Sequence, residues 1–137
     1  MTAIQLSRAR DLPRAEGTAK PAIDLEPLLG SWAIFAEQTT GIARVELDEA
    51  GGVVSVRAFG SGPGEPPDWG LAAARVFADD VEGTEAWGFR ASYDHGFERV
   101  ELFGYLNRGL LAVEAGTTFS AEDGRSAYFT RTFMYCP

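Results

Sequence analysis

The sequence predicts an all-β protein, an eight-stranded antiparallel up-and-down barrel with an irregular N-terminal arm. From Gly30 onward, β-favouring stretches alternate with turn residues at intervals of about 12 residues. Within several stretches, apolar and polar residues alternate with a period of two, which is typical of strands with one buried face. Strands joined only by hairpins leave two exposed edges unless the sheet closes on itself, so we expect a closed barrel.

The turn residues divide the chain into expected strands at residues 31–38, 42–48, 53–59, 71–78, 86–93, 97–106, 110–119 and 126–135. Short turns separate several of them, including Asp94-His95-Gly96, where glycine accepts positive φ. A longer loop, Gly60 to Gly70, separates the third and fourth, because its prolines lack backbone N–H donors. Stretch 71–78 (LAAARVFA) carries the weakest strand signal, since its alanines also suit a helix.

We expect two regions, an N-terminal arm or lid at residues 1–29 and the barrel domain at residues 30–137. The arm carries Arg8, Arg10, Arg14 and Lys20 and is interrupted by proline and glycine, which favours a loosely docked segment. A lid over a binding site is the alternative. Residues 22–29 suit one helical turn, with Asp24 as its N-cap and Gly30 as its stop. Residues 1–21 hold no apolar run that suits a secretory signal, so we expect a cytoplasmic protein without a membrane partner.

Charge and residue counts exclude several kinds of site. The net charge of −8 argues against nucleic acid, which basic side chains bind by displacing counterions. A single cysteine, Cys136, excludes a disulfide framework and a thiolate zinc site. A single histidine, His95, excludes a multi-histidine metal site. We therefore expect neither a metal nor a cofactor.

Alternation assigns many small residues to the inside of the expected barrel. They are Ala43, Ala58, Ala74, Ala91, Gly104 and Ala115. Bulky inward side chains fill an eight-stranded barrel, whereas small ones leave space for one ligand. We therefore expect an internal cavity with an aromatic wall formed by Trp87, Phe89, Tyr93, Phe129 and Phe133.

The first strand opens with Gly30-Ser31-Trp32, and a Gly-x-Trp in this place resembles the start of lipocalins, avidins and related calycin barrels. In lipocalins this tryptophan closes the barrel floor, and a basic residue of the last strand packs over its ring. The resemblance implies that role for Arg131. Stretches 40–42, 58–60, 68–70 and 123–129 are similar to uncharacterised small bacterial barrel proteins, which implies the fold over about residues 28–135 and no activity. No residues match the biotin pocket of avidins.

Alternating strand directions bring the loops at 60–70, 94–96 and 120–125 to the end opposite Trp32. We expect this end to be the open mouth, because it holds the longest loop and many polar side chains. They are Asp68, Asp94, His95, Glu98, Asp123 and Arg125.

The candidate catalytic residues are Tyr93, His95 and Arg131. An imidazole suits proton transfer near neutral pH, and a phenol or guanidinium polarises a carbonyl. Each also has a structural interpretation: Tyr93 as a barrel-wall residue with a satisfied hydroxyl, His95 as a solvated turn residue and Arg131 as a structural residue. The candidate ligand-binding residues are Trp69, Trp87, Phe89, Ala91, Tyr128, Asp68 and Gln38. Asp68 suits a loop cap equally well, and Trp69 suits an anchor for the long loop.

These features favour a protein that binds one small hydrophobic or aromatic molecule inside the barrel. The alternative is a cofactor-free cyclase or isomerase of secondary metabolism, acting like a pericyclase on a polyketide-like natural-product intermediate in the same cavity. A third interpretation is a structural domain, a homodimer whose interface includes Phe59, Phe97, Phe103 and Tyr105.

Overall fold

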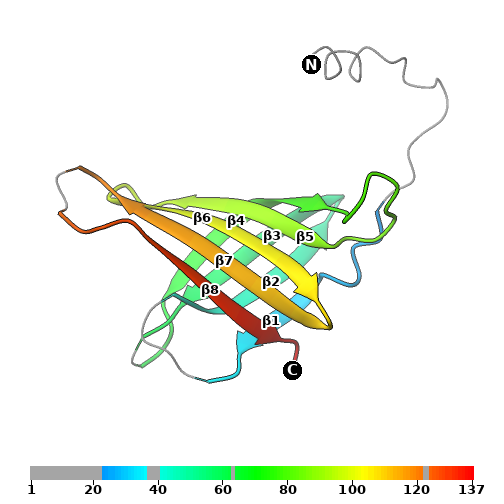
Figure 1. Cartoon of the computed structure of the whole chain (residues 1–137), viewed down its shortest axis with the longest axis horizontal. Helices are drawn as coiled ribbons and strands as arrows, with labels where there is room; N and C mark the ends of the chain where they lie inside the picture. Colours follow the sequence, from blue (N-terminus) through cyan, green and yellow to red (C-terminus); the bar gives the residue numbers. More distant parts are fainter. Residues whose placement is uncertain (1–22, 37–40, 63, 122–123) are drawn as a thin grey trace, which may run out of the picture.

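The structure of the chain, a computed structural model, describes residues 23–36, 41–62, 64–121 and 124–137. These residues form a closed barrel of eight antiparallel strands in sequence order (Figure 1). The strands are β1 (Gly30–Ile34), β2 (Ile42–Ala50), β3 (Val53–Gly60), β4 (Asp68–Phe77), β5 (Gly88–Asp94), β6 (Glu98–Asn107), β7 (Leu110–Phe119) and β8 (Tyr128–Tyr135). The predicted all-β barrel is confirmed.

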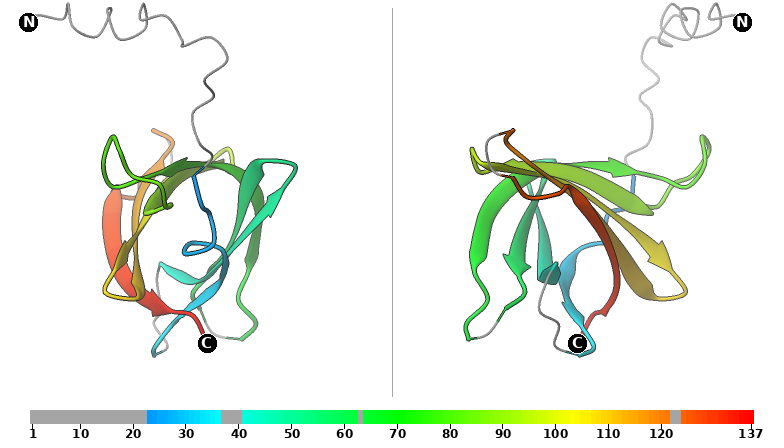
Figure 2. Two further views of the ribbon diagram at one scale, coloured as in Figure 1. Left: turned by 90° about the vertical axis from the view of Figure 1, so that its right-hand side faces the viewer. Right: turned by 60° about the vertical axis from the view of Figure 1, so that its left-hand side comes forward.

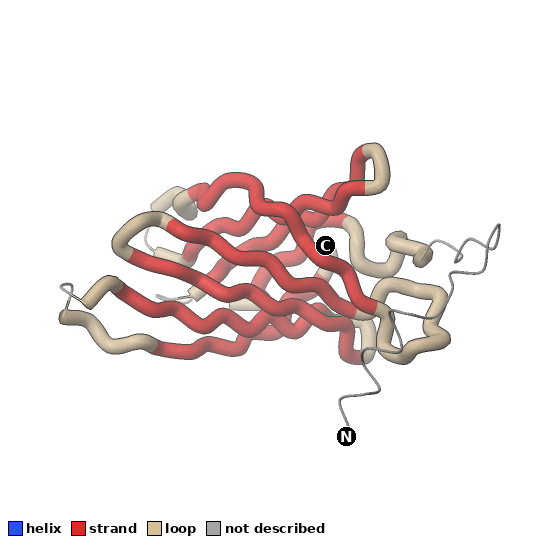
Figure 3. Tube along the Cα trace, turned by 90° about the horizontal axis from the view of Figure 1, so that it is seen from above, coloured by secondary structure: helices blue, strands red, loops and turns tan. Residues whose placement is uncertain are grey.

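The strand boundaries differ from the expected ones mainly at β1 and β4. β1 ends at Ile34, and Gln38 lies outside the described residues. β4 begins at Asp68, so the last residues of the expected long loop start the strand instead. The alanine-rich stretch that follows is strand as well, and Figure 3 shows strands and loops but no helix among the described residues.

The ring of paired strands is not equally continuous everywhere. β6 and β7 pair along their whole length, from Glu98↔Phe119 to Asn107↔Leu110. β1 and β8 close the barrel through two register pairs, and β4 and β5 share three. The ladder is therefore shortest at these two junctions.

The interior of the barrel is packed with side chains. Phe89, Leu102, Leu111 and Met134 are all at most 2% exposed and belong to one hydrophobic core. Gly104, one of the small inward residues, lies against Phe89, and a Cβ added there would overlap the Phe89 ring. The expected hollow centre is therefore corrected: small residues here make room for large neighbours, as close packing demands.

The described part of the expected arm, residues 23–29, packs into one end of the barrel. The Asp24 backbone N–H donates to the Thr84 carbonyl, and the Ala86 N–H donates to the Asp24 carbonyl, both at 2.8 Å. One turn follows, and its Leu28 side chain is 1% exposed in the core. The Trp32 indole N–H donates to the Leu28 carbonyl at 3.0 Å. Looking along the barrel, the blue segment before β1 lies within the ring of strands (Figure 2, left). Leu28 therefore plugs the Trp32 end, whereas residues 1–22 lie outside the described part.

Aromatic side chains expected inside the barrel lie on its outer face instead. Phe129 and Phe133 of β8 are 63% and 40% exposed. Met134, which follows Phe133 in the same strand, is buried. Trp87, just before β5, is 40% exposed and stacks on Tyr105 with ring centroids 5.2 Å apart. The expected position of these three rings in the interior wall is therefore wrong.

The residues expected at an intersubunit patch are spread over several elements. Phe97 and Phe103 are exposed. Phe59 lies under the Arg44 guanidinium, 4.1 Å from the ring centroid. A homodimer stays a prediction, which light scattering checks.

Candidate functional site: a cleft between β4 and β5

A cleft of about 790 Å³ opens in the barrel wall between β4 and β5. The two strands pair only at Arg75↔Arg90, Val76↔Phe89 and Phe77↔Gly88. Beyond this point β4 stays paired with β3, and β5 stays paired with β6. The two strands therefore separate and face each other across the cleft, whose lining is Trp69, residues 71–75 and residues 90–95.

The residues that face the cleft explain why the ladder stops. On the β4 side, Leu71 and three alanines, residues 72–74, lie between Trp69 and Arg75. Cross-strand pairs stabilise a sheet mainly through large apolar, aromatic or oppositely charged side chains, which alanine does not supply. The last register pair places Arg75 opposite Arg90, and like charges in that position are unfavourable. Cross-strand side-chain contacts therefore contribute little to the stability of the β4–β5 pairing here.

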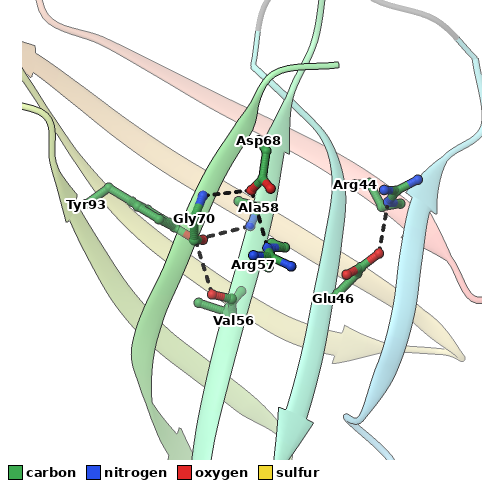
Figure 4. Close-up of polar contacts among 8 residues, drawn as sticks. All are labelled: Arg44, Glu46, Val56, Arg57, Ala58, Asp68, Gly70 and Tyr93. Carbon is green, nitrogen blue, oxygen red and sulfur yellow. Dashed lines mark hydrogen bonds and ion pairs between the residues drawn. The ribbon is translucent and has the colours of Figure 1, made fainter. Parts of the chain in front are cut away.

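The Tyr93 side chain reaches from β5 under this gap to the neighbouring strands (Figure 4). Its hydroxyl donates to the Gly70 carbonyl at 2.9 Å and accepts a hydrogen bond from the Ala58 N–H at 3.1 Å. The β3–β4 register shifts between Arg57 and Phe59, so Ala58 has no ladder partner on β4. Tyr93 thus satisfies the peptide groups at this irregularity and forms the floor of the cleft.

Burial raises the pKa of the Tyr93 phenol above its ordinary value of 10.0. The Ala58 N–H opposes this effect, the Asp68 charge adds to it, and the Arg57 charge opposes it. The phenol is therefore neutral at physiological pH, and its one proton is engaged by a backbone carbonyl.

An aromatic cluster lies at the open end of the cleft. The rings of Trp69, Tyr93 and His95 meet edge to face, with centroids 5.5–5.8 Å apart. A Cβ added at Gly60 would lie 2.9 Å from the Trp69 indole nitrogen, so glycine is needed there for the ring to pack. The expectation that Trp69 and His95 share one end of the barrel is confirmed.

His95 occupies the turn between β5 and β6. Its backbone N–H donates to the Glu98 carbonyl at 2.8 Å, and its Nδ1 lies 3.7 Å from Glu98 Oε1. The Gly96 N–H donates to the Asp94 carboxylate at 2.9 Å, and Arg99 contacts the same carboxylate at 3.3 Å. The hydrogen bond from the Gly96 N–H is the main cause that lowers the pKa of Asp94, and the hydrogen bond from Arg99 lowers it further. The acidic groups at this end are therefore already partnered.

Asp68 acts as a local brace at the start of β4. Its carboxylate accepts a hydrogen bond from the Gly70 N–H at 2.8 Å and lies 3.3 Å from Arg57 Nε. Gly70 has a φ of +88°, which favours glycine. These contacts match the loop-capping interpretation, and Asp68 lies next to the cleft rather than in its lining.

The structure brings together four of the residues predicted from the sequence, Trp69, Ala91, Tyr93 and His95. The others lie elsewhere. Phe89 is part of the core, Trp87 lines a separate hollow of about 300 Å³, and Tyr128 lines an outer groove of about 440 Å³. Gln38 is outside the described residues.

Arg131 lies on the outer face of β8, apart from Tyr93 and His95. Its guanidinium is 3.7 Å from Glu114 Oε2, and its side chain is 56% exposed. It also lies over the Phe133 ring, 5.9 Å from the centroid, whereas Trp32 is buried inside the barrel. The expected contact of Arg131 with Trp32 is therefore wrong, and Arg131 does not share a site with the other candidate catalytic residues.

Several residues of the cleft were not singled out from the sequence. They are Arg75, Arg90, Ala73 and Ser92. Their place depends on where the β4–β5 ladder ends, which is a non-local property. The available signal was an arginine in each of the two consecutive stretches LAAARVF and GFRASYD.

Scans against protein-family models, curated proteins and solved structures found no match for this chain. Among the described residues, no three His, Cys, Asp or Glu side chains group as a metal site requires. No helix within the same residues is long and apolar enough to cross a membrane.

Proposed function

We propose that the chain binds one small molecule with a hydrophobic or aromatic body in the cleft between β4 and β5. The observation that carries this proposal is the cleft itself. Its volume of about 790 Å³ falls within the range of roughly 300–1,000 Å³ that is typical of ligand sites. The sequence placed the ligand on the barrel axis, and the packed core moves the proposed site into the wall.

The lining supports a ligand with an apolar body. The exposed Leu71 and Ala73 offer apolar surface on the β4 side, and the small side chains at residues 72, 74 and 91 let a ring or chain approach both strands closely. At the open end, the edge-to-face cluster of Trp69, Tyr93 and His95 offers aromatic surface. Aromatic contacts of this kind contribute about 0.5–1.5 kcal/mol beyond the buried area.

The neutral fluorescent probe N-phenyl-1-naphthylamine tests the proposal. Ala73→Trp fills the cleft from an exposed position, so the barrel still folds. We expect the wild type to bind the probe with one site and Ala73→Trp to lose at least tenfold in affinity. Ala50→Trp, an exposed alanine at the end of β2, is the matched control and keeps wild-type affinity. Equal binding by wild type and Ala73→Trp contradicts the proposal.

The catalytic alternative now depends on His95 rather than on three residues. His95 lies at the cleft mouth with Glu98 Oε1 3.7 Å from its Nδ1, which places a carboxylate beside a residue type suited to general-base catalysis. The Tyr93 hydroxyl is engaged by backbone groups. A cyclase or isomerase would lose far more turnover than probe affinity in His95→Gln, whereas a binding protein shows no turnover in either form.

We also propose membership of the calycin-like barrels and a cytoplasmic location. The eight-stranded closed barrel with a buried Trp32 at the start of β1 supports the former. The lone cysteine, Cys136, is free and supports the latter. Fractionation of cells that express the tagged chain tests the location.

A further inference from the structure

Two arginine side chains at the closed end of the cleft have no polar partner in the part of the chain that the structure describes. Among the described arginines, those at 44, 57, 99 and 131 each lie within 4 Å of a carboxylate, Arg125 lies over aromatic rings, and Arg108 lies in the turn between β6 and β7, outside the cleft. The side chains of Arg75 and Arg90 make no ion pair or hydrogen bond with any described residue. Both are exposed, and both line the cleft.

The two arginines also face each other directly. They form the last register pair of the β4–β5 ladder, which places their Cβ atoms about 5 Å apart. The acidic side chain diagonal to Arg90 is Glu101, which instead accepts a hydrogen bond from Ser92 Oγ at 2.8 Å. In a chain with net charge −8, an opposed and uncompensated arginine pair is a local concentration of positive charge.

We infer that Arg75 and Arg90 together bind the anionic group of the ligand, a carboxylate or a phosphate. This inference rests on the proposed function, because it adds a charged group to the apolar ligand of the same cleft. A guanidinium group matches the spacing of two oxygens in either anion and binds them through two parallel hydrogen bonds. One anion between two arginines also removes their mutual repulsion.

The spacing of the cleft sets the shape of this ligand. From Arg90 to His95 the β5 strand and its turn advance by five residues, or roughly 17 Å. The anion lies at the arginine end, and the apolar body extends along the alanines toward Trp69. An amphipathic acid with its charge at one end fits this arrangement.

A matched pair of probes separates the charge from the body. 8-Anilinonaphthalene-1-sulfonate carries the ring system of N-phenyl-1-naphthylamine and one added sulfonate. We expect the sulfonate probe to bind at least tenfold more tightly to the wild type. Its affinity falls with rising salt while that of the neutral probe stays constant, because salt screens exposed charges.

Variants then assign the difference to the two arginines. Arg75→Gln and Arg90→Gln each weaken the sulfonate probe by about threefold to tenfold, and the double variant abolishes its advantage over the neutral probe. The neutral probe is measured with the same variants, and the loss assigned to the charge is the loss of the sulfonate probe beyond that of the neutral probe. Arg108→Asn is the control, because Arg108 is a described arginine outside the cleft lining and asparagine tolerates its φ of 54°.

The outcomes distinguish this inference from the proposed function. Equal affinity for the two probes, or a sulfonate advantage that survives in the double variant, overturns the anion site alone. Failure of Ala73→Trp to reduce either probe overturns the proposed function. Competition by decanoate or by decyl phosphate, with decan-1-ol as the uncharged control, identifies which anion the arginines prefer.

Discussion

Replacing Tyr93 by phenylalanine removes one oxygen atom from the cleft floor and leaves the ring in place. The Ala58 N–H then loses its acceptor, which lies at 3.1 Å, and Ala58 is 0% exposed. The Gly70 carbonyl loses a donor at 2.9 Å but is only partly buried, so water replaces it at little cost. An unsatisfied buried peptide group costs about 1–3 kcal/mol, so we expect unfolding free energy to fall by about 2 kcal/mol. For a domain of this size that corresponds to a Tm lower by roughly 6–10 °C.

Urea denaturation followed by circular dichroism measures this change. Tyr128→Phe removes a hydroxyl from a tyrosine that is 42% exposed, and as the control it changes stability by less than about 0.5 kcal/mol. A loss below about 0.5 kcal/mol in Tyr93→Phe would refute the role given to the hydroxyl.

The same variant gives a pH signature. The folded-state pKa of Tyr93 is raised above its ordinary 10.0, so the unfolded chain releases the proton first as pH rises. The contribution of the hydroxyl is fully present below pH 10 and is lost as pH rises through the folded-state pKa. The stability difference between wild type and Tyr93→Phe therefore narrows above about pH 10, and a difference that widens there contradicts the assigned shift.

Three further predictions test the packing and the turn at the mouth. Gly104→Ala, whose Cβ would overlap Phe89, lowers stability by about 1–3 kcal/mol; Gly116→Ala, with 3.8 Å of space to Phe129, is the control and changes it little in the same denaturation assay. Leu28→Ala lowers stability by about 2–5 kcal/mol if Leu28 plugs the barrel, whereas Leu71→Ala, 66% exposed, leaves the urea midpoint almost unchanged. Asp94→Asn lowers Tm at neutral pH. Because the pKa of Asp94 is lowered from 3.8, the Tm difference between this variant and the wild type disappears as pH falls below that value. A Tm difference that persists in strong acid contradicts the assignment.

The fold was predictable because its signals are local. Alternation and turn residues repeat along the chain, and hairpin-linked strands in sequence order need no long-range pairing information. The inward face of β8 was assigned wrongly because both faces of this strand carry aromatic residues. Arg131 shares its phase with Phe129 and Phe133, and burying a charge costs more than exposing two rings. Weighing that charge would have assigned the strand correctly.

The candidate site was predictable only in part. The turn order along the chain brings Trp69 and His95 to one end in any up-and-down barrel, and the structure places them in contact. The cleft itself depends on where β4 leaves β5, which no single stretch encodes. Each of the two stretches has the pattern of an ordinary strand. Only the register between β4 and β5 shows that small side chains and like charges face each other there.

The junction between β4 and β5 is tied at both ends and open between them. Three ladder pairs hold it beside Arg75 and Arg90, and the Tyr93 hydroxyl links β5 to Gly70 of β4 near the mouth. Because both ties belong to the folded barrel, the length of the opening is fixed before any ligand arrives. A preformed opening reduces the ordering cost of binding. If the proposed site is correct, ligand length becomes a criterion of selection, since a chain must span from the arginine pair to the aromatic cluster to use both. Affinity in a series of straight-chain acids should therefore rise with each added methylene until the chain reaches Trp69 and then level off. A barrel that adjusts its opening to each ligand would show no such plateau.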